Sequence, residues 1–311
     1  MSKKRMVIAL GHKDLGFTLT EQKEAVKRTA VMIGDFIEDG YQVALVFSNA
    51  PQVGMIHTAM KDLSEHYPKQ YGKVPLSVCS AMSQGMIGYD LQNAVRAELV
   101  KRGIYKTAST VLTQVLVDPY DESFYNPIKK VGKIMGPEEA KAEEDNGNHV
   151  IMVADGKFQR VVPAPTPKSI VEIDAIKALL DADQVVIACG GGGIPVLRQG
   201  SELKGAAAVI EKDRTAGLLA KEVDADILLI TTAVDHVSLN FGQPDEKAID
   251  KMTIEEAEQY IKDGHFEFRS MQPKVEAGVD FVQSGKDRKC IITSMELAEK
   301  AVEGLAGTAI I

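Results

Sequence analysis

Cysteine and long apolar runs are both scarce in this chain. Its three cysteines, Cys79, Cys189 and Cys290, are an odd number without CxxC spacing, which excludes a disulfide framework and favours a reducing cytoplasm. No segment approaches the roughly 20 apolar residues that a membrane helix needs. The basic amino terminus leads into an apolar run of about five residues, which is too short for a signal peptide. We therefore expect a cytoplasmic globular protein that has no membrane partner.

Several catalytic and metal-binding motifs are also missing. The six histidines show neither HxxxH nor HExxH spacing, so no protein-held metal site is predicted. The chain contains no GxSxG sequence and no GxxxxGKS or GxxxxGKT sequence, which disfavours serine hydrolases and Walker-type NTPases. GxGxxG does not follow the first predicted strand, which argues against a nicotinamide-binding domain.

Positive charge is in deficit, with 36 Lys and Arg against 44 Asp and Glu and a formal net charge of −8. A negative global field argues against nucleic acid or an anionic membrane as a partner. Any anionic substrate must therefore be attracted by a local cluster of lysine or arginine side chains.

Strand-like and helix-like segments alternate through most of the 311 residues. This alternation predicts an α/β fold in which crossover helices join parallel strands. The predicted strands cover residues 6–10, 42–47, 109–117, 185–187, 226–231, 289–293 and 308–311. The predicted helices cover 18–40, 87–103 and 170–180, and others begin after Glu211, near Thr253, at Pro273 and near Leu297. Two of these helix starts, at Thr18 and at Thr253, have capping-box spacing to a glutamate.

The middle of the chain departs from this alternation. Residues 118–164 are rich in Pro, Gly, Lys and Glu and have only a short apolar island at 149–154. We interpret this segment as a protruding subdomain or lid within a single domain covering residues 1–311. The alternative is a solvated insertion without a role.

A run of four glycines is the most informative local feature. The apolar residues 185–187 are followed closely by Gly190, Gly191, Gly192 and Gly193. Glycine tolerates positive φ and lets a ligand approach the main chain closely. A strand that ends in such a loop offers backbone amides to phosphate oxygens. The loop predicts a phosphorylated small molecule or a nucleotide as ligand.

Lysine side chains are the best catalytic candidates from the residues alone. Lys212 lies at a predicted helix start between Glu211 and Asp213, where it could stabilise a transferring phosphoryl group. The alternative is a capped, solvated helix start. The further candidates are cations or residues that follow strand ends: Lys129 and Lys130 on the predicted lid, Lys274, Arg160 and Asp235.

Motifs spread along the whole chain resemble those of the carbamate kinases, which are members of the amino acid kinase superfamily. The motifs that carry the resemblance are Pro51-Gln-Val-Gly54, Met82-Ser-Gln-Gly85, Ile87-Gly-Tyr89, Val111-Leu-Thr-Gln-Val115, Arg160-Val-Val-Pro163, Ala188-Cys-Gly-Gly-Gly-Gly-Ile-Pro195, Ala208-Val-Ile-Glu-Lys-Asp213, Asn240-Phe-Gly242, Ser270-Met271 and Pro273-Lys274. The resemblance implies a three-layer αβα sandwich with a mainly parallel sheet, a small protruding subdomain and a homodimer. It also implies reversible phosphoryl transfer between ATP and carbamate, with Mg²⁺, in arginine or other nitrogen catabolism.

The resemblance also implies roles for individual residues. Lys129 and Lys212 would neutralise the transferring phosphoryl group, and Asp213 would orient these lysines. The nucleotide would contact Gly190, Gly191, Gly192, Gly193, Asp235, Phe241, Met271 and Lys274. The substrate and the phosphoryl group would contact Gly11, His12, Lys13, Ser48, Asn49, Ala50 and Arg160.

Two loops depart from the family pattern. Where this chain has Gly11-His12-Lys13, the carbamate kinases that it resembles have Gly-Gly-Asn. Where it has Phe47-Ser48-Asn49-Ala50, they have His-Gly-Asn-Gly. In both loops a side chain replaces glycine where backbone amides would surround the phosphoryl group. The sequence therefore favours a carbamate-kinase-type phosphotransferase. It leaves open a relative with another acceptor, or a nucleotide-binding regulatory subunit without catalysis.

Overall fold

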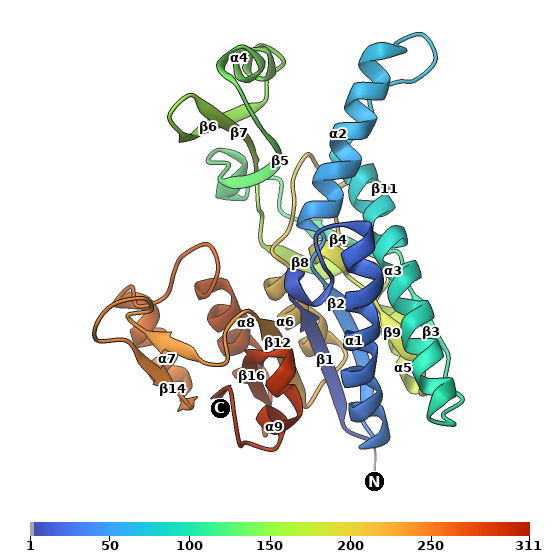
Figure 1. Ribbon diagram of the computed structural model, residues 1–311, viewed down its shortest axis with the longest axis vertical. Coiled ribbons are helices and arrows are strands. Elements are labelled where there is room, and N and C mark those ends of the chain that lie inside the picture. The colour runs from blue at the N-terminus through green and yellow to red at the C-terminus, as the bar shows by residue number, and fades with distance from the viewer. Residues whose placement is uncertain (1–2) are drawn as a thin grey trace.

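A twisted eight-stranded sheet forms the centre of the computed structural model, which describes residues 3–311 (Figure 1). Its strand order is β15-β17-β16-β12-β1-β2-β9-β3, and every pair except the antiparallel β16 and β17 is parallel. The strands in that order are Lys251–Met252, Thr308–Ile310, Lys289–Ser294, Ile227–Thr232, Arg5–Leu10, Gln42–Phe47, Val185–Ile187 and Ala108–Thr110.

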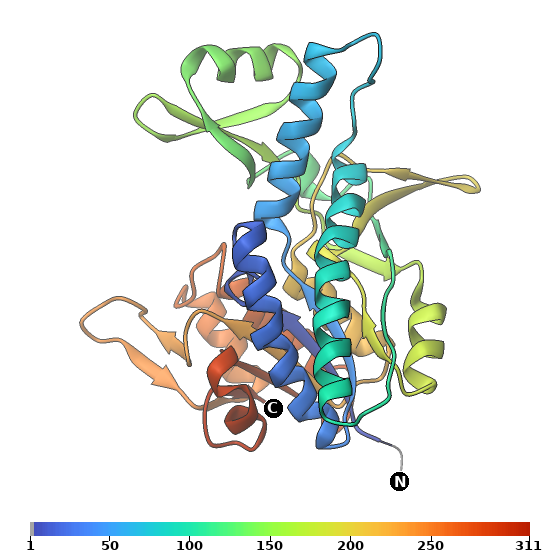
Figure 2. The same ribbon diagram turned by 45° about the vertical axis from the view of Figure 1, so that its right-hand side comes forward.

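Helices cover both faces of this sheet, as the two views show (Figure 2). On one face α1, α3 and the short α9 pack against the sheet, and on the other face lie α5, α6 and α8. Their bounds are α1 Leu19–Glu38, α3 Leu76–Lys101, α9 Ala298–Val302, α5 Ile173–Asp181, α6 Lys212–Glu222 and α8 Gln272–Val282. The α/β fold with a mainly parallel central sheet is confirmed.

Strand β1 shows why the sequence forms this sandwich. Val7 and Ala9 pack into the core under α6 and α8, whereas Met6, Ile8 and Leu10 pack into the core under α1 and α3. A parallel strand that is buried on both faces needs apolar residues at every position. The uninterrupted apolar run from Met6 to Leu10 therefore predicts a central strand.

Within residues 3–311, three smaller sheets lie outside the central one. The first has the order β11-β10-β4-β8, the second is the three-stranded β5-β7-β6, and the third pairs β13 with β14. Their strands are β11 Glu202–Gly205, β10 Ile194–Gln199, β4 Gln114–Val117, β8 Pro167–Ile170, β5 Lys129–Met135, β7 Lys157–Val162, β6 His149–Ala154, β13 Val237–Leu239 and β14 Lys247–Ile249. The remaining helices are α2 Ala50–His66, α4 Pro137–Asp145 and α7 Ile254–Lys262.

The segment between residues 118 and 164 contains the β5-β7-β6 sheet and α4, and it stands away from the central sheet beside the upper part of α2 (Figure 1). Contacts between β5 and α2 join it to the body of the molecule. Residues 129–162 of this segment are named the lid, and the closing movement of the lid remains a prediction.

Both predicted capping boxes are present in the structure. The side chain of Thr18 accepts a hydrogen bond from the Glu21 amide, and the side chain of Thr253 accepts one from the Glu256 amide. In each pair the glutamate carboxylate accepts a hydrogen bond from the threonine amide in return. These reciprocal bonds fix where α1 and α7 begin.

Three predictions of secondary structure were wrong in detail. The predicted helix 87–103 begins earlier, because α3 covers Leu76–Lys101. The predicted strand 109–117 is two strands, because the chain leaves the central sheet after Thr110 and β4 pairs instead with β10. The predicted helix 170–180 begins later, since Ile170 closes strand β8 and α5 starts at Ile173. Sequence reasoning also missed the whole of α2 and the β10-β11 hairpin.

No helix among the described residues is long and apolar enough to cross a membrane.

We predict that Leu91→Ala in α3 destabilises the protein far more than Val100→Ala in the same helix. Leu91 is fully buried and Val100 is 49% exposed. Truncation of a buried leucine costs about 2–5 kcal/mol, whereas an exposed position changes stability by about 0.5 kcal/mol. Urea unfolding of both variants measures the difference. Equal free energies of unfolding would contradict the burial of Leu91 between α3 and the sheet.

Candidate active site

A cavity of about 510 Å³ lies at the ends of three neighbouring strands of the central sheet. The segments that follow β1, β2 and β12 all reach it, because parallel strands bring their carboxyl ends to one edge. The lid closes one side with Lys129, Lys130 and Val131 of β5. Residues from widely separated parts of the chain therefore surround a single space.

Three helices begin at the wall of this cavity. Ala50 opens α2, Lys212 opens α6, and Met271 precedes the first residue of α8. The N-cap residues of these helices form no side-chain capping hydrogen bond. The amino end of a helix carries partial positive charge and unpaired amides, so the cavity suits an anion.

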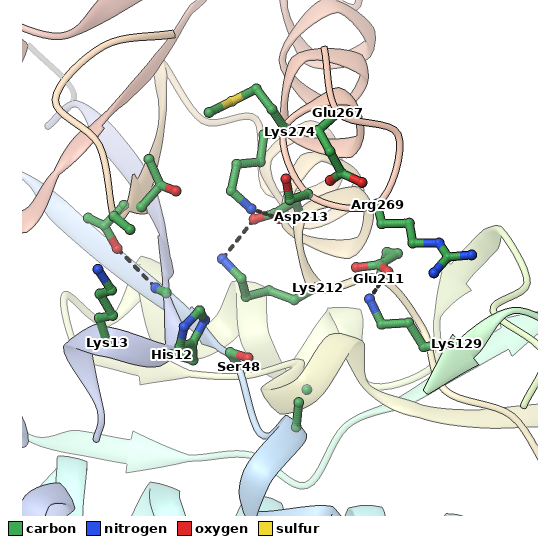
Figure 3. Close-up of a pocket in the computed structure, with 18 of the residues that line it drawn as sticks. His12, Lys13, Ser48, Lys129, Glu211, Lys212, Asp213, Glu267, Arg269 and Lys274 are labelled. Carbon is green, nitrogen blue, oxygen red and sulfur yellow. Dashed lines mark hydrogen bonds and ion pairs between the residues drawn. The ribbon is translucent and has the colours of Figure 1, made fainter. Parts of the chain in front are cut away.

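A buried carboxylate bridges two lysines in the centre of the site (Figure 3). Asp213 Oδ1 lies 2.7 Å from Lys212 Nζ, and Asp213 Oδ2 lies 2.6 Å from Lys274 Nζ. Lys212 Nζ also donates a hydrogen bond to the Ala9 carbonyl at 3.2 Å. One carboxylate thus fixes ammonium groups from α6 and α8 at the same wall of the cavity.

Burial and charge oppose each other at this centre. Burial alone would raise the pKa of the Asp213 carboxyl, but the ammonium groups of Lys212 and Lys274 outweigh it and hold that pKa far below its ordinary value. Burial lowers the pKa of Lys212, Asp213 raises it, and Lys274 lowers it again. The net effect on Lys212 is a lowered pKa, which makes its charge depend on the Asp213 carboxylate.

The turn after β1 is anchored by a second buried carboxylate. Asp14 accepts hydrogen bonds from the Gly11 amide at 2.8 Å and from the Thr231 hydroxyl. Thr29 of α1 donates to the Asp14 carbonyl at 2.7 Å. Burial raises the pKa of Asp14 despite these bonds. The turn is therefore held rigidly at the edge of the cavity, and it presents His12 and Lys13.

The lid meets the core through one ion pair in the cavity. Lys129 of β5 pairs with Glu211, the N-cap residue of α6. Arg269 and Glu267, from the segment before α8, line the same side. An anion bound at the start of α6 would therefore lie within reach of a lysine from the lid.

The structure brings most of the predicted site residues together. The cavity is lined by Gly11, His12, Lys13, Ser48, Asn49, Ala50, Lys129, Gly191, Lys212, Asp213, Phe241, Met271 and Lys274. Sequence reasoning missed several further residues that line the cavity, among them Asp14, Thr231, His265 and Glu267. Among these, only Asp14 gives a signal in the sequence, as a carboxylate three residues after Gly11.

Three of the four glycines lie behind the cavity wall instead of lining it. A Cβ atom at Gly190 would lie 2.3 Å from the Phe47 ring, one at Gly192 would lie 2.4 Å from the Ile210 carbonyl, and one at Gly193 would lie 2.3 Å from Val115. The amides of Gly192 and Gly193 already donate to main-chain carbonyls. Close packing explains these three glycines. Gly191 is the one of the four that lines the cavity, and it too is closely packed, because a Cβ atom there would lie 2.1 Å from the Asn49 side chain.

Besides these three glycines, two further predicted residues do not line the cavity. The main-chain carbonyl of Asp235 accepts a hydrogen bond from Thr293 Oγ1 at 3.1 Å. Arg160 lies in a separate small depression between the lid and α2, where its Nη1 is 3.2 Å from His57 Nε2. Burial lowers the pKa of both Arg160 and His57. In this conformation Arg160 joins the lid to α2.

Comparison with known proteins identifies the family. The model of the amino acid kinase family matches residues 4–294 of this chain. The chain belongs to the amino acid kinase family. Within that family, the resemblance to carbamate kinases that the sequence motifs carry is confirmed by full-length relatives.

Several amino acid kinases are similar to this chain over its whole length. The carbamate kinase-like protein YqeA of Escherichia coli is 46% identical over 310 residues, and the carbamate kinase of Clostridium perfringens is 45% identical over 313 residues. Each alignment covers 99% of both chains. The structure of the carbamate kinase from Giardia lamblia bound to AMP-PNP superposes with a TM-score of 0.92 at 37% identity, covering 100% of this chain and 99% of the other.

We predict that Asp213→Asn lowers the free energy of unfolding by about 3–5 kcal/mol, because it leaves two buried ammonium groups without a counter-charge. Asp145→Asn is the matched control, since its side chain is 66% exposed at the end of α4. Chemical denaturation of both variants at neutral pH measures the effect.

The same variant tests the pH dependence. The pKa of Asp213 is lower in the folded protein than its ordinary value of 3.8. The contribution of Asp213 to the free energy of unfolding is therefore fully present above pH 3.8, and it is lost as the pH falls through the pKa of the folded state. As the pH falls, the wild type should lose this part of its free energy of unfolding, whereas Asp213→Asn should not. An unchanged acid profile would contradict the assignment.

Proposed function

We propose that this protein is a carbamate kinase, an enzyme that transfers a phosphoryl group reversibly between ATP and carbamate. The observation that carries the proposal is the Asp213 carboxylate bridging Lys212 and Lys274 at the start of α6, inside a cavity where three helices begin. A relative that is 45% identical over the full chain bears the name carbamate kinase. We further propose ATP formation from carbamoyl phosphate and ADP as the working direction, in arginine or other nitrogen catabolism.

In the proposed reaction an oxygen of the ADP β-phosphate attacks the phosphorus of carbamoyl phosphate. The bond between phosphorus and the carbamate oxygen breaks, and carbamate leaves with that electron pair. Lys212 on the core and Lys129 on the lid would stabilise the negative charge on the phosphoryl oxygens from two sides. Asp213 keeps the Lys212 ammonium charged and aimed at the cavity.

The nucleotide would occupy the side of the cavity formed by Phe241, Met271 and Lys274. The phosphates would pass beside Gly191, whose φ of +67° favours glycine and where a Cβ atom would lie 2.1 Å from the Asn49 side chain. A relative from Giardia lamblia has been solved with AMP-PNP, which supports ATP or ADP as the nucleotide.

Mg²⁺ would enter with the nucleotide phosphates. Among residues 3–311, no group of three His, Cys, Asp or Glu side chains could hold a metal ion. The carboxylates of Asp213 and Glu211 are already paired with lysines. Mg²⁺ commonly keeps several waters and binds substrate phosphates, so this donor set fits an ion carried by the phosphates.

We also propose a cytoplasmic homodimer. The three free cysteines are all buried, which fits a reducing compartment. Helix α3 exposes Val78, Met82 and Tyr89, which share one helical face. A second copy of the chain that covers this face would bury the apolar side chains.

We predict that Lys212→Ala reduces ATP formation from carbamoyl phosphate and Mg-ADP by about 10²- to 10³-fold, because it removes a preorganised charge from the phosphoryl group. Calorimetric ADP binding should remain. Lys221→Ala, at the exposed last turn of the same helix, is the control and should retain turnover. Full activity of Lys212→Ala, or no ADP binding by the wild type, would overturn the proposal.

A second candidate function is favoured by the two altered loops. His12, Ser48 and Ala50 place side chains in the cavity where the family pattern has glycine. An acceptor other than carbamate, or loss of catalysis, would explain these side chains.

We predict that the combined variant His12→Gly, Ser48→Gly and Ala50→Gly separates the two functions. If the chain is a working carbamate kinase, the variant gains no turnover of carbamoyl phosphate. A gain of about 10²-fold or more would favour the altered acceptor or the non-catalytic subunit, because each restored amide contact can contribute such a factor. ATP formation by the wild type and the variant, at equal ADP saturation, decides between them.

A further inference from the structure

The backbone of the turn after β1 does not require a particular residue at position 12. His12 opens a short right-handed turn, and its φ is not positive. The residue before it, Gly11, has a φ of −71°. The bonds of Asp14 to the Gly11 amide and to Thr231 fix this turn. Backbone strain therefore does not explain why histidine is found at position 12. The turn holds the imidazole at a fixed place beside the cavity.

The imidazole of His12 is supported on one side and open on the other. The Phe17 ring meets it edge-on, with 5.2 Å between the ring centroids. Among residues 3–311, no protein group forms a hydrogen bond with either of its ring nitrogens, in contrast to His57, His66 and His265. In Figure 3 His12 lies between Lys13 and Ser48, with Lys212 on the facing wall. Both ring nitrogens are thus available to a ligand in the cavity.

The charged groups around His12 are mostly ammonium groups. Lys13 belongs to its own turn, Lys212 comes from α6 and Lys274 from α8, while Asp14 is the nearby carboxylate. His12 is exposed at the mouth of the turn, yet partial desolvation lowers its pKa, Asp14 raises it, and the three lysines lower it further. Without a bound anion these groups keep the pKa of His12 below its ordinary value of 6.5, so the neutral form predominates at pH 7. An anion that binds among these lysines cancels their repulsion and favours the imidazolium.

We propose that His12 is an anion ligand at the acceptor end of the cavity and that it takes up a proton when a phosphoryl or other doubly charged tetrahedral anion binds beside Lys13 and Lys212. The inference rests on the proposed function, because that function supplies the phosphoryl group. The protonated ring adds a donor and a positive charge to the phosphoryl oxygens. His12 thus replaces, with a side chain, an amide contact that the family pattern makes with glycine.

Proton uptake links the affinity for the anion to pH. Below the pKa that His12 has in the free protein, the imidazole is protonated with or without the anion. Above the pKa that it has in the complex, the imidazole is neutral with or without the anion. Between these two values the anion binds more weakly as the pH rises, by at most about tenfold per pH unit for one linked proton. Affinity is therefore highest on the acid side of neutrality.

Sulfate is a suitable probe, because it stays a tetrahedral dianion over this pH range. We expect calorimetric titration of the whole protein to show several-fold tighter sulfate binding at about pH 6 than at about pH 8. Titrations in two buffers of different ionisation enthalpy should show uptake of a fraction of one proton. Nuclear magnetic resonance of the histidine ring carbons should show the pKa of His12 rising when sulfate is added.

Two variants identify the residue. His12→Asn fits the right-handed turn, and it should bind sulfate equally weakly at both pH values with no proton uptake. His66→Asn is the control, because His66 is exposed at the far end of α2 and bonds to the Asp62 carbonyl, and it should behave like the wild type.

The outcomes separate this proposal from the proposed function. Sulfate affinity that is independent of pH in the wild type, an unchanged His12 pKa, or the absence of sulfate binding would each overturn the role of His12. In any of these cases, turnover of carbamoyl phosphate would leave the kinase function standing. A protein that shows the His12 effect with sulfate but no turnover would instead count against the kinase function alone.

Discussion

The arrangement of the site depends on one buried carboxylate between two ammonium groups. Asp213 compensates the charges of Lys212 and Lys274, and burial would otherwise drive Lys212 toward its neutral form. Because Asp213 and Lys212 begin α6 and Lys274 lies in the first turn of α8, the same bridge sets how these two helices meet. The two helices also pack closely against each other, since a Cβ atom at Gly217 of α6 would lie only 3.0 Å from the Ala277 carbonyl of α8.

Around this bridge the fold concentrates positive potential in a protein whose net charge is −8. The parallel sheet brings the ends of β1, β2 and β12 to one edge, and α2, α6 and α8 begin there. Helix amino ends and lysine ammonium groups therefore act on the same small volume. The lid adds Lys129 from a different part of the chain. A local field of this kind attracts a polyanion despite the overall charge.

Patterns of neighbouring residues in the sequence predicted the central strands and the starts of two helices correctly. Apolar runs located the central strands, and threonine with glutamate three residues later located the starts of α1 and α7. Helix α2 was missed because Pro51 and Gly54 interrupt its pattern, and its stability comes from contacts with α3 and β5. The position of Arg160 could not be predicted, because it depends on how the lid packs against α2. The glycine run was located correctly, yet all four of its glycines serve close packing, against Phe47, Asn49, Ile210 and Val115.

The central position of β1 has a consequence for the synthesis of the chain. One of its neighbours, β2, follows after a single helix, but Arg5 at the start of β1 meets Asp226 beside β12, 221 residues later. At ordinary elongation rates a ribosome needs on the order of ten seconds or more to make that stretch. During this interval an apolar strand has one unpaired edge, which is a template for association between nascent chains. Chaperone binding to the first 50 residues during translation would protect that edge.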